Sequence, residues 1–240
     1  MCISVLIPIY NTKIEYFKEC LNSIQNQTFQ KQIEVIVVND GSSIKITKQI
    51  VKLTEKLNNI RKNIIYKLFH LNKNYGIQYA LNFGLKKCSY ELIARMDADD
   101  IMKPKRLELQ YNYMMKNLKV VILGGQCEIM NEKSKKITYT TNHPKKITKN
   151  DIKTNKNKHW FINHPTVMYK KSVILGVGGY NNNLYKHAED MDLWFKLIKK
   201  GYDLYNLEDI ILTYRDCPNS LSHTFKYDIH KDINKWIDNL

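Results

Sequence analysis

The hexapeptide RMDADD at residues 95–100 carries three carboxylates, those of Asp97, Asp99 and Asp100. It follows the short apolar stretch 92–94, so the pattern places the aspartates at the end of a buried strand. Carboxylates gathered at such a point repel one another unless a cation or a polar ligand offsets their charge. An Asp-x-Asp pair offers the oxygen ligands that Mg²⁺ and Mn²⁺ prefer, with waters and substrate phosphates in the remaining positions. The motif therefore suggests metal and phosphate chemistry, although a solvated acidic turn has the same pattern.

The first hundred residues must position this motif, and they alternate short apolar runs with helical patterns. Such alternation indicates β–α–β units around a mainly parallel sheet. We expect strands at 3–9, 33–39, 64–69 and 91–96, and helices near 14–24, 45–57 and 77–85. Right-handed crossovers bring the carboxyl ends of such strands to one edge of the sheet, where ligands bind in open α/β folds.

After residue 100 the pattern becomes mixed. We expect a helix from Pro104 to about Met114, a strand at 120–129 that need not be parallel, a short unit at 166–180, a helix at 189–199 and a strand at 210–214. A C-terminal helix is expected from the apolar positions Phe225, Ile229, Ile233, Trp236 and Ile237. Its apolar stripe would cap the domain, form a dimer or lie on a membrane surface.

Composition narrows the class of protein. With 240 residues, 43% of them hydrophobic, the chain forms one substantial core with an appended piece, and it is not a mainly disordered protein. The net charge of +15 is spread along most of the chain, which argues against a nucleic-acid groove. The densest lysine stretch, 132–159, is either a solvated loop or a region that attracts an anionic acceptor, nucleic acid or a membrane.

Location follows from what the sequence lacks. No apolar run reaches the roughly 18 residues of a membrane span, and the N-terminus has no basic region of the kind that opens a signal peptide. We therefore expect a cytoplasmic protein, with peripheral membrane contact still open. The five cysteines are scattered and show no CxxC spacing, so they are expected to be reduced thiols and not zinc ligands.

Three expected strand ends carry polar residues, at 8–11, at 39–42 and at the acidic cluster. No GxGxxG or GxxxxGK[ST] motif lies near them, so neither a Rossmann dinucleotide site nor a P-loop is expected. A nucleotide would bind differently, with the ring of Tyr10 on its base and Asp40 accepting from a ring or ribose donor. A metal held by Asp97 and Asp99 would then neutralise the diphosphate.

Eight segments, in order, resemble a family 2 glycosyltransferase with the GT-A fold. They are SVLIPIYN at 4–11, VIVVNDGSS at 35–43, NKNYGIQYALNFGL at 72–85, ARMDADD at 94–100, 104–110, HPTVMYKKS at 164–172, GGY at 178–180 and AEDMDLW at 188–194. The resemblance covers roughly residues 3–215 and implies a Rossmann-like, mainly parallel central sheet flanked by helices, followed by a mixed acceptor-side half. It places a glycosyltransferase domain at 1–217, with a nucleotide-binding half at 1–100 and an acceptor-side half at 101–217, and a helical extension at 218–240.

The resemblance also implies a role for each matching residue. The residues of the nucleoside pocket and its wall would be Pro8, Tyr10, Asp40, Asn74 and Gly76, with Arg95 on the approach to the diphosphate. Asp97 would contact the ribose or a metal-bound water, and Asp99 would bind the divalent ion, Mn²⁺ or Mg²⁺.

Asp190 resembles the general base that deprotonates an acceptor hydroxyl in inverting members of the family. An acidic pair such as Glu189-Asp190 is also favoured at a helix start by the macrodipole alone. One position departs from the family: Tyr214-Arg215-Asp216 is followed by Cys217 where many relatives have histidine, and His223 is a candidate substitute.

The resemblance therefore implies a metal-dependent, inverting transferase of hexosyl or N-acetylhexosaminyl groups. Its donor would be a nucleotide sugar, most simply a UDP-sugar, and its acceptor a hydroxyl of a glycan, a protein or a lipid-linked molecule. The alternative is a non-catalytic module of the same fold that binds nucleic acid or an anionic polymer through its basic surface. A nucleotidyltransferase is a third possibility, but it leaves the segment at 188–194 without a role.

Overall fold

The computed structural model describes residues 2–154, 162–181, 189–218 and 237. Its first half contains β1 (Ile3–Ile9), α1 (Ile14–Gln25), β2 (Ile33–Asn39), α2 (Ile44–Leu57), β3 (Ile64–His70), α3 (Ile77–Lys87) and β4 (Leu92–Arg95). Its second half contains β5 (Ile101–Met102), α4 (Arg106–Lys116), β6 (Ile122–Asn131), β7 (Ile137–Thr140), β8 (Lys146–Ile147), α5 (Lys149–Thr154), η1 (His164–Thr166), β9 (Met168–Lys170), α6 (Lys171–Gly176), α7 (Glu189–Lys199) and β10 (Leu204–Asp216).

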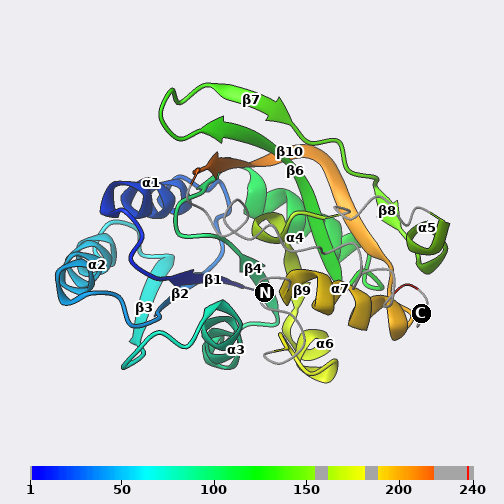
Figure 1. Ribbon diagram of the computed structural model, residues 1–240, viewed down its shortest axis with the longest axis horizontal. Helices are drawn as coiled ribbons and strands as arrows, with labels where there is room; N and C mark the ends of the chain where they lie inside the picture. The colour runs from blue at the N-terminus through cyan, green and yellow to red at the C-terminus, as the bar shows by residue number, and fades with distance from the viewer. Residues whose placement is uncertain (1, 155–161, 182–188, 219–236, 238–240) are drawn as a thin grey trace.

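The first half is the parallel sheet that the sequence predicts. β1 pairs in parallel with both β2 and β4, and β2 pairs in parallel with β3. Every residue of β1 and β2 is buried, as their near-continuous runs of Val and Ile require for strands that helices cover on both faces. The three expected crossovers through α1, α2 and α3 are therefore confirmed (Figure 1).

Helices cover the two faces of the sheet in separate groups. One core cluster joins Val5 and Ile7 of β1 to α1, α2 and α4, and the other joins Leu6 of β1 to α3, α6 and α7. Alternate residues of a strand point to opposite faces, so a single strand supplies both clusters. The carboxyl end of β1 is fixed in this way between two layers of helices.

β9 connects the two halves of the sheet. It is antiparallel to β4 on one side and to β6 on the other, and β10 then pairs in parallel with β6. The order β3-β2-β1-β4-β9-β6-β10-β5 places the end of β4 beside elements from residues 164–180, far along the chain. The short unit expected at 166–180 contains β9 and α6, with the 3₁₀ turn η1 in front of β9.

The strand expected at 210–214 was predicted too short. β10 runs from Leu204 to Asp216, and its pairing with β6 shifts register between Asn206 and Leu212. Residues 208–210 are exposed at this irregularity, which interrupts the apolar pattern that would mark one long strand.

The sequence left the stretch 132–159 open between a solvated loop and a region that attracts an anionic partner, and its described part is not a plain loop. The stretch up to residue 154 contains β7, β8 and α5. β7 is exposed throughout and pairs with β6, while Ile147 of β8 and Ile152 of α5 are buried. The two buried isoleucines attach this lysine-rich segment to the core. Two apolar positions are too few to produce a recognisable periodicity in the sequence.

The expected C-terminal helix and His223 lie outside the described residues, apart from Ile237, which is helical and buried. Among the described residues, no helix has the length and apolar character needed to cross a membrane.

A buried carboxylate stabilises the end of the sheet opposite the acidic motif. Glu34, only 3% exposed, accepts hydrogen bonds from Ser4, Lys67 and Ser89 at 2.6–2.8 Å. Burial raises its pKa, but these bonds outweigh burial and leave the pKa below its ordinary value of 4.5. A depressed carboxyl pKa stabilises the fold at pH values above 4.5, and that stability is lost as the pH falls toward the folded-state value.

We expect Glu34→Gln to lower the free energy of unfolding at pH 7 by about 2–3 kcal/mol, because three donors lose a charged acceptor. The difference from wild type should shrink as the pH falls below 4.5, where wild-type Glu34 also becomes protonated. Urea unfolding at several pH values measures it, with the exposed Glu55→Gln as the matched control. A difference that is the same at pH 7 and pH 3 would contradict this account.

Candidate active site

Loops after β1 and β2 are tied together by side chains at the carboxyl edge of the sheet. The amide of Asn11 donates to Ser42 Oγ at 2.9 Å, and Asn11 Oδ1 accepts from the amide of Ser43 at 2.9 Å. Asn11 has φ of +48°, a conformation that Asn tolerates better than most residues. The turn leaves the ring of Tyr10 51% exposed, as a surface that could stack on a base must be.

Pro8 is buried in β1, where its missing N–H costs little. Leu6 accepts from Met96 on the β4 side of the strand, so Pro8, two residues on, faces that same side just past the end of β4. No ladder partner is lost there. The strand therefore opens at Pro8 toward the space between β1 and β4.

Asp40 holds the loop that precedes α3. Its two carboxylate oxygens accept from the amides of Tyr75 and Gly76, at 2.8 and 2.9 Å. Burial raises the pKa of Asp40, and the two N–H donors oppose that shift. Sequence reasoning placed this carboxylate against a ring or ribose, whereas in the structure its partners are backbone groups.

The same loop crosses closely over Gly41. A Cβ on Gly41 would lie 2.2 Å from the carbonyl carbon of Lys73, and its φ is +71°. Glycine is required there for both reasons. Asn74, in the loop, is exposed, and Gly76 begins α3 with φ of +91°. Asp40, Asn74 and Gly76 are thus neighbours, as predicted, in a wall fixed by Asp40.

In the acidic turn after β4, the side chains separate into different environments. Arg95, only 2% exposed, binds both oxygens of Asp97, each at 2.7 Å. Asp99 is partly exposed, and burial together with the charge of Asp97 raises its pKa to about 6. Asp100 is 1% exposed. Of the three aspartates, Asp97 and Asp99 are partly exposed and can reach a ligand at the carboxyl edge of the sheet. The Arg95 guanidinium is already bound to Asp97.

Glu189 and Asp190 form the second acidic group, at the start of α7. Burial and the neighbouring Asp190 raise the pKa of Glu189 to about 7, and burial also raises the pKa of Asp190. Both carboxylates interact electrostatically with Arg95 and Asp97. The structure therefore brings the end of β4 and the start of α7 together, and the roles that the resemblance implies for these residues stay predictions.

His164 lies beside this group as a buried, hydrogen-bonded residue, as expected. Its Nε2 shares a hydrogen bond of 2.9 Å with the hydroxyl of Tyr180, and its Nδ1 is 3.9 Å from Glu189 Oε1. Burial and the nearby Arg95 hold its pKa well below the ordinary value, so the imidazole is neutral. Its ring meets the edge of Trp194, which is 2% exposed and therefore a core ring.

Asn82 positions the Gly178-Gly179-Tyr180 segment, and sequence reasoning missed it. It donates to the Tyr180 carbonyl at 2.6 Å and accepts from the Tyr180 amide at 2.9 Å. A Cβ on Gly179 would lie 2.5 Å from Asn82 Oδ1. The double glycine in the sequence was the available signal for such a close approach.

The carboxylates of Asp97 and Asp99 suit one hard divalent ion, whose remaining ligands would come from the substrate. Within the described residues, no group of three or more His, Cys, Asp and Glu side chains is arranged to hold a metal alone. Two carboxylates plus substrate phosphates are, however, a common Mg²⁺ arrangement. The surroundings of Asp99 disfavour its anion, as the raised pKa indicates, and a divalent cation would reverse this.

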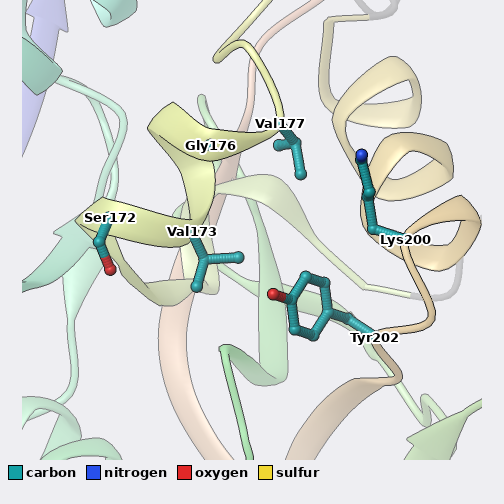
Figure 2. Close-up of a pocket in the computed structure, with 6 residues that line it drawn as sticks. All are labelled: Ser172, Val173, Gly176, Val177, Lys200 and Tyr202. Carbon is teal, nitrogen blue, oxygen red and sulfur yellow. The ribbon is translucent and has the colours of Figure 1, made fainter.

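A separate cavity of about 340 Å³ lies between α6 and the residues after α7 (Figure 2). Its lining residues are Ser172, Val173, Gly176, Val177, Lys200 and Tyr202. None of them is a candidate site residue, so the cavity is not the place where the acidic groups meet.

A mainly parallel sheet, an Asp-x-Asp turn after β4 and an acidic helix start facing it define a glycosyltransferase of the GT-A type. The model of the family described as Glycosyl transferase family 2 matches residues 4–176, and the chain belongs to this family.

One relative is named UDP-Gal:alpha-D-GlcNAc-diphosphoundecaprenol beta-1,3-galactosyltransferase, from Escherichia coli. It is 37% identical over 88% of this chain and 73% of its own length. Two solved structures share the fold. S. aureus TarS 1–349 in complex with UDP-GlcNAc has a TM-score of 0.72 at 22% identity, over 99% of this chain and 65% of that one. The mannosyltransferase PcManGT from Pyrobaculum calidifontis, in complex with GDP-Man and Mn²⁺, has a TM-score of 0.66 at 16% identity, over 92% of this chain and 58% of that one.

Proposed function

We propose that the chain is a metal-dependent, inverting glycosyltransferase that moves a sugar from a UDP-sugar to a hydroxyl acceptor. The observation that carries the proposal is the meeting of two acidic groups, Asp97 and Asp99 after β4 and Glu189 and Asp190 at the start of α7, around Arg95. Inverting transfer needs one end of a cleft for the leaving diphosphate and a base at the other. A relative with a UDP-galactose donor and a fold neighbour with UDP-GlcNAc support the choice of donor.

In this proposal the first half binds the donor nucleotide. Pro8 and the exposed ring of Tyr10 form one side of the nucleoside pocket, and the wall at Asn74 and Gly76, fixed by Asp40, forms the other. Arg95 holds Asp97 in one orientation toward the ribose or a metal-bound water.

Asp99, with Asp97, holds Mn²⁺ or Mg²⁺ against the diphosphate, and the ion neutralises the charge of the departing nucleotide. The Mn²⁺ in a fold neighbour supports this role for the metal.

Asp190 is the proposed general base. Its raised pKa makes it a stronger proton acceptor than an ordinary aspartate, and its Oδ1 accepts from the amide of Met191 at 2.8 Å, which fixes the carboxylate. The neutral His164 and the Tyr180 hydroxyl beside it complete the acceptor side. The acceptor hydroxyl belongs to a glycan, a protein or a lipid-linked molecule, and the domain that carries out transfer spans residues 1–217.

A screen of UDP-, GDP- and other nucleotide-sugar donors with Mn²⁺ or Mg²⁺ tests the proposal. Water can replace the acceptor in this assay, so we expect slow hydrolysis of at least one UDP-sugar with release of UDP. Because the reaction is proposed to need the metal, EDTA should abolish this activity. In a parallel assay with UTP and a sugar 1-phosphate in place of the nucleotide sugar, release of pyrophosphate would instead identify a nucleotidyltransferase. Salt-sensitive binding to nucleic acid, with no thermal shift from UDP and Mn²⁺, would favour the non-catalytic module and overturn the proposal.

A further inference from the structure

Asp100, the last residue of the acidic motif, is turned into the protein. Its side chain is 1% exposed, and its Oδ1 accepts from the backbone amide of Arg215 at 2.9 Å. Its Oδ2 is buried and has no hydrogen-bond partner among the described residues. A carboxylate in this position cannot reach a substrate, and an isolated buried charge is costly unless another charge compensates it. Burial raises the pKa of Asp100 well above the ordinary carboxyl value, which favours the neutral acid and lessens that cost.

Arg106 of α4 contacts the backbone at the start of the turn. It is fully buried, and its Nη2 donates to the carbonyl oxygens of Arg95, at 2.7 Å, and Val167, at 3.4 Å. Its Nε donates to Gln110 Oε1 at 3.2 Å, while its Nη1, like Asp100 Oδ2, has no partner among the described residues. Burial lowers the pKa of Arg106 to about 9, and Asp100 is the strongest influence that raises it. Arg106 therefore stays charged at neutral pH.

Arg215 of β10 grips the other end of the turn. Its Nε donates to the carbonyl of Asp99 at 2.8 Å, and its Nη2 forms an ion pair with Glu19. The guanidinium carbon lies 4.0 Å from the ring centroid of Tyr16, and no part of the side chain is exposed. The Tyr16 ring, the Glu19 carboxylate and the Asp99 carbonyl together restrict the Arg215 guanidinium to one orientation.

The two arginines thus hold the backbone at the two ends of the segment that carries Asp97 and Asp99. We propose that Arg106 and Arg215 are positioning residues that set the separation and orientation of the Asp97 and Asp99 carboxylates through the backbone of the turn. The proposal rests on the proposed function, which gives these carboxylates their role in binding the metal and the donor. Both arginine side chains are buried, so they would act through the turn and not by contact with the donor or the metal. A well-packed apolar residue at position 106 would avoid the cost of a buried charge, so core packing alone does not account for arginine there.

Arg106→Met removes the guanidinium and leaves the carbonyl of Arg95 without its donor, so it should lower Tm by several degrees. In measurements well below that lowered Tm, folded variant is compared with folded wild type, which separates positioning from stability. We expect the affinity for Mn²⁺ in the presence of UDP to be about 10–100-fold weaker than in wild type.

Titration calorimetry and the electron paramagnetic resonance of free Mn²⁺ measure this affinity without turnover. Lys105→Met, the exposed neighbour, is the matched control for loss of one positive charge and should bind as wild type does. Arg106→Lys keeps the charge without the fork and should fold with an intermediate loss. A folded Arg106→Met variant that binds Mn²⁺ and UDP as wild type does would overturn the proposal.

Failure of the proposed function would look different. A wild-type protein that binds neither UDP nor Mn²⁺ would reject that function. Wild-type binding that Arg106→Met leaves unchanged would keep the proposed function and overturn this inference by itself.

Discussion

Replacing Asp190 by asparagine should lower kcat for sugar transfer by about 10²–10⁴-fold, the usual contribution of a general base. Asparagine keeps the size of the side chain and can still accept from the amide of Met191, but it cannot take the acceptor proton. Asp190 has no proposed contact with the nucleotide or the metal, so KM for the donor and the affinity for UDP should change little. Steady-state kinetics with the donor found in the hydrolysis screen measures both parameters.

The raised carboxyl pKa values predict the direction in which kcat changes with pH. Burial raises the pKa values of Glu189 and Asp190, that of Glu189 to about 7, so the pair titrates above the ordinary carboxyl range. The base must be ionised, and kcat for wild type should therefore fall as the pH drops through that raised range. The residual activity of Asp190→Asn should lack this acidic limb.

Asp203→Asn is the matched control, because Asp203 pairs with Lys146 outside the candidate site. It should keep wild-type kcat and pH profile. An Asp190→Asn variant that folds, binds UDP and retains kcat within a few-fold of wild type would remove Asp190 from the role of base.

The parallel half of the fold could be predicted closely because its signals are local and strong. β1 and β2 are short segments rich in Val, Ile and Leu, and the helices between strands repeat their apolar residues every three or four positions. The bounds of both strands and of α7 agree with the expectation. The second half offered weaker signals, since β7 is fully exposed and β10 is interrupted at residues 208–210.

The candidate site divides in the same way. Segment order was enough to name Asp97, Asp99 and Asp190, but it could not indicate which side chains face the cleft. Asp40 was predicted to contact the nucleoside, and this stays a prediction; the sequence did not indicate that its two oxygens also accept from the amides of Tyr75 and Gly76. Residue type alone does not distinguish a carboxylate that contacts a substrate from one that holds a loop.

The buried positions of Arg106 and Arg215 could not be predicted from the sequence. An arginine in an amphipathic helix normally predicts a solvent-facing position, yet Arg106 is fully buried under β4. Its partners are the carbonyls of Arg95 and Val167, so only the tertiary pairing of β4 with β9 creates its environment. A contact of this kind leaves no periodicity in the sequence.

Asp99→Asn is expected to have the other large effect, a loss of about 10³-fold in kcat/KM with Mn²⁺ at concentrations that saturate wild type. A bound divalent ion supplies several kcal/mol of charge stabilisation to a departing diphosphate, and about 1.4 kcal/mol corresponds to each factor of ten. Asp99 has no arginine bound to both its oxygens, whereas Asp97 has Arg95. Asp99→Asn should therefore weaken Mn²⁺ binding more than Asp97→Asn does, and part of the activity should return at high Mn²⁺.

The Asp97→Asn and Asp99→Asn variants should differ in the direction of their effect on Tm. Asp97→Asn leaves Arg95 buried without its charged partner and should lower Tm, whereas Asp99→Asn relieves the repulsion that raises the pKa of Asp99 and should leave Tm equal or higher. Exposed Asp209→Asn controls for the loss of one negative charge. If Asp99→Asn binds Mn²⁺ and UDP as tightly as wild type while Asp97→Asn does not, the assignment of the metal to Asp99 is wrong and Asp97 is the ligand despite its contact with Arg95.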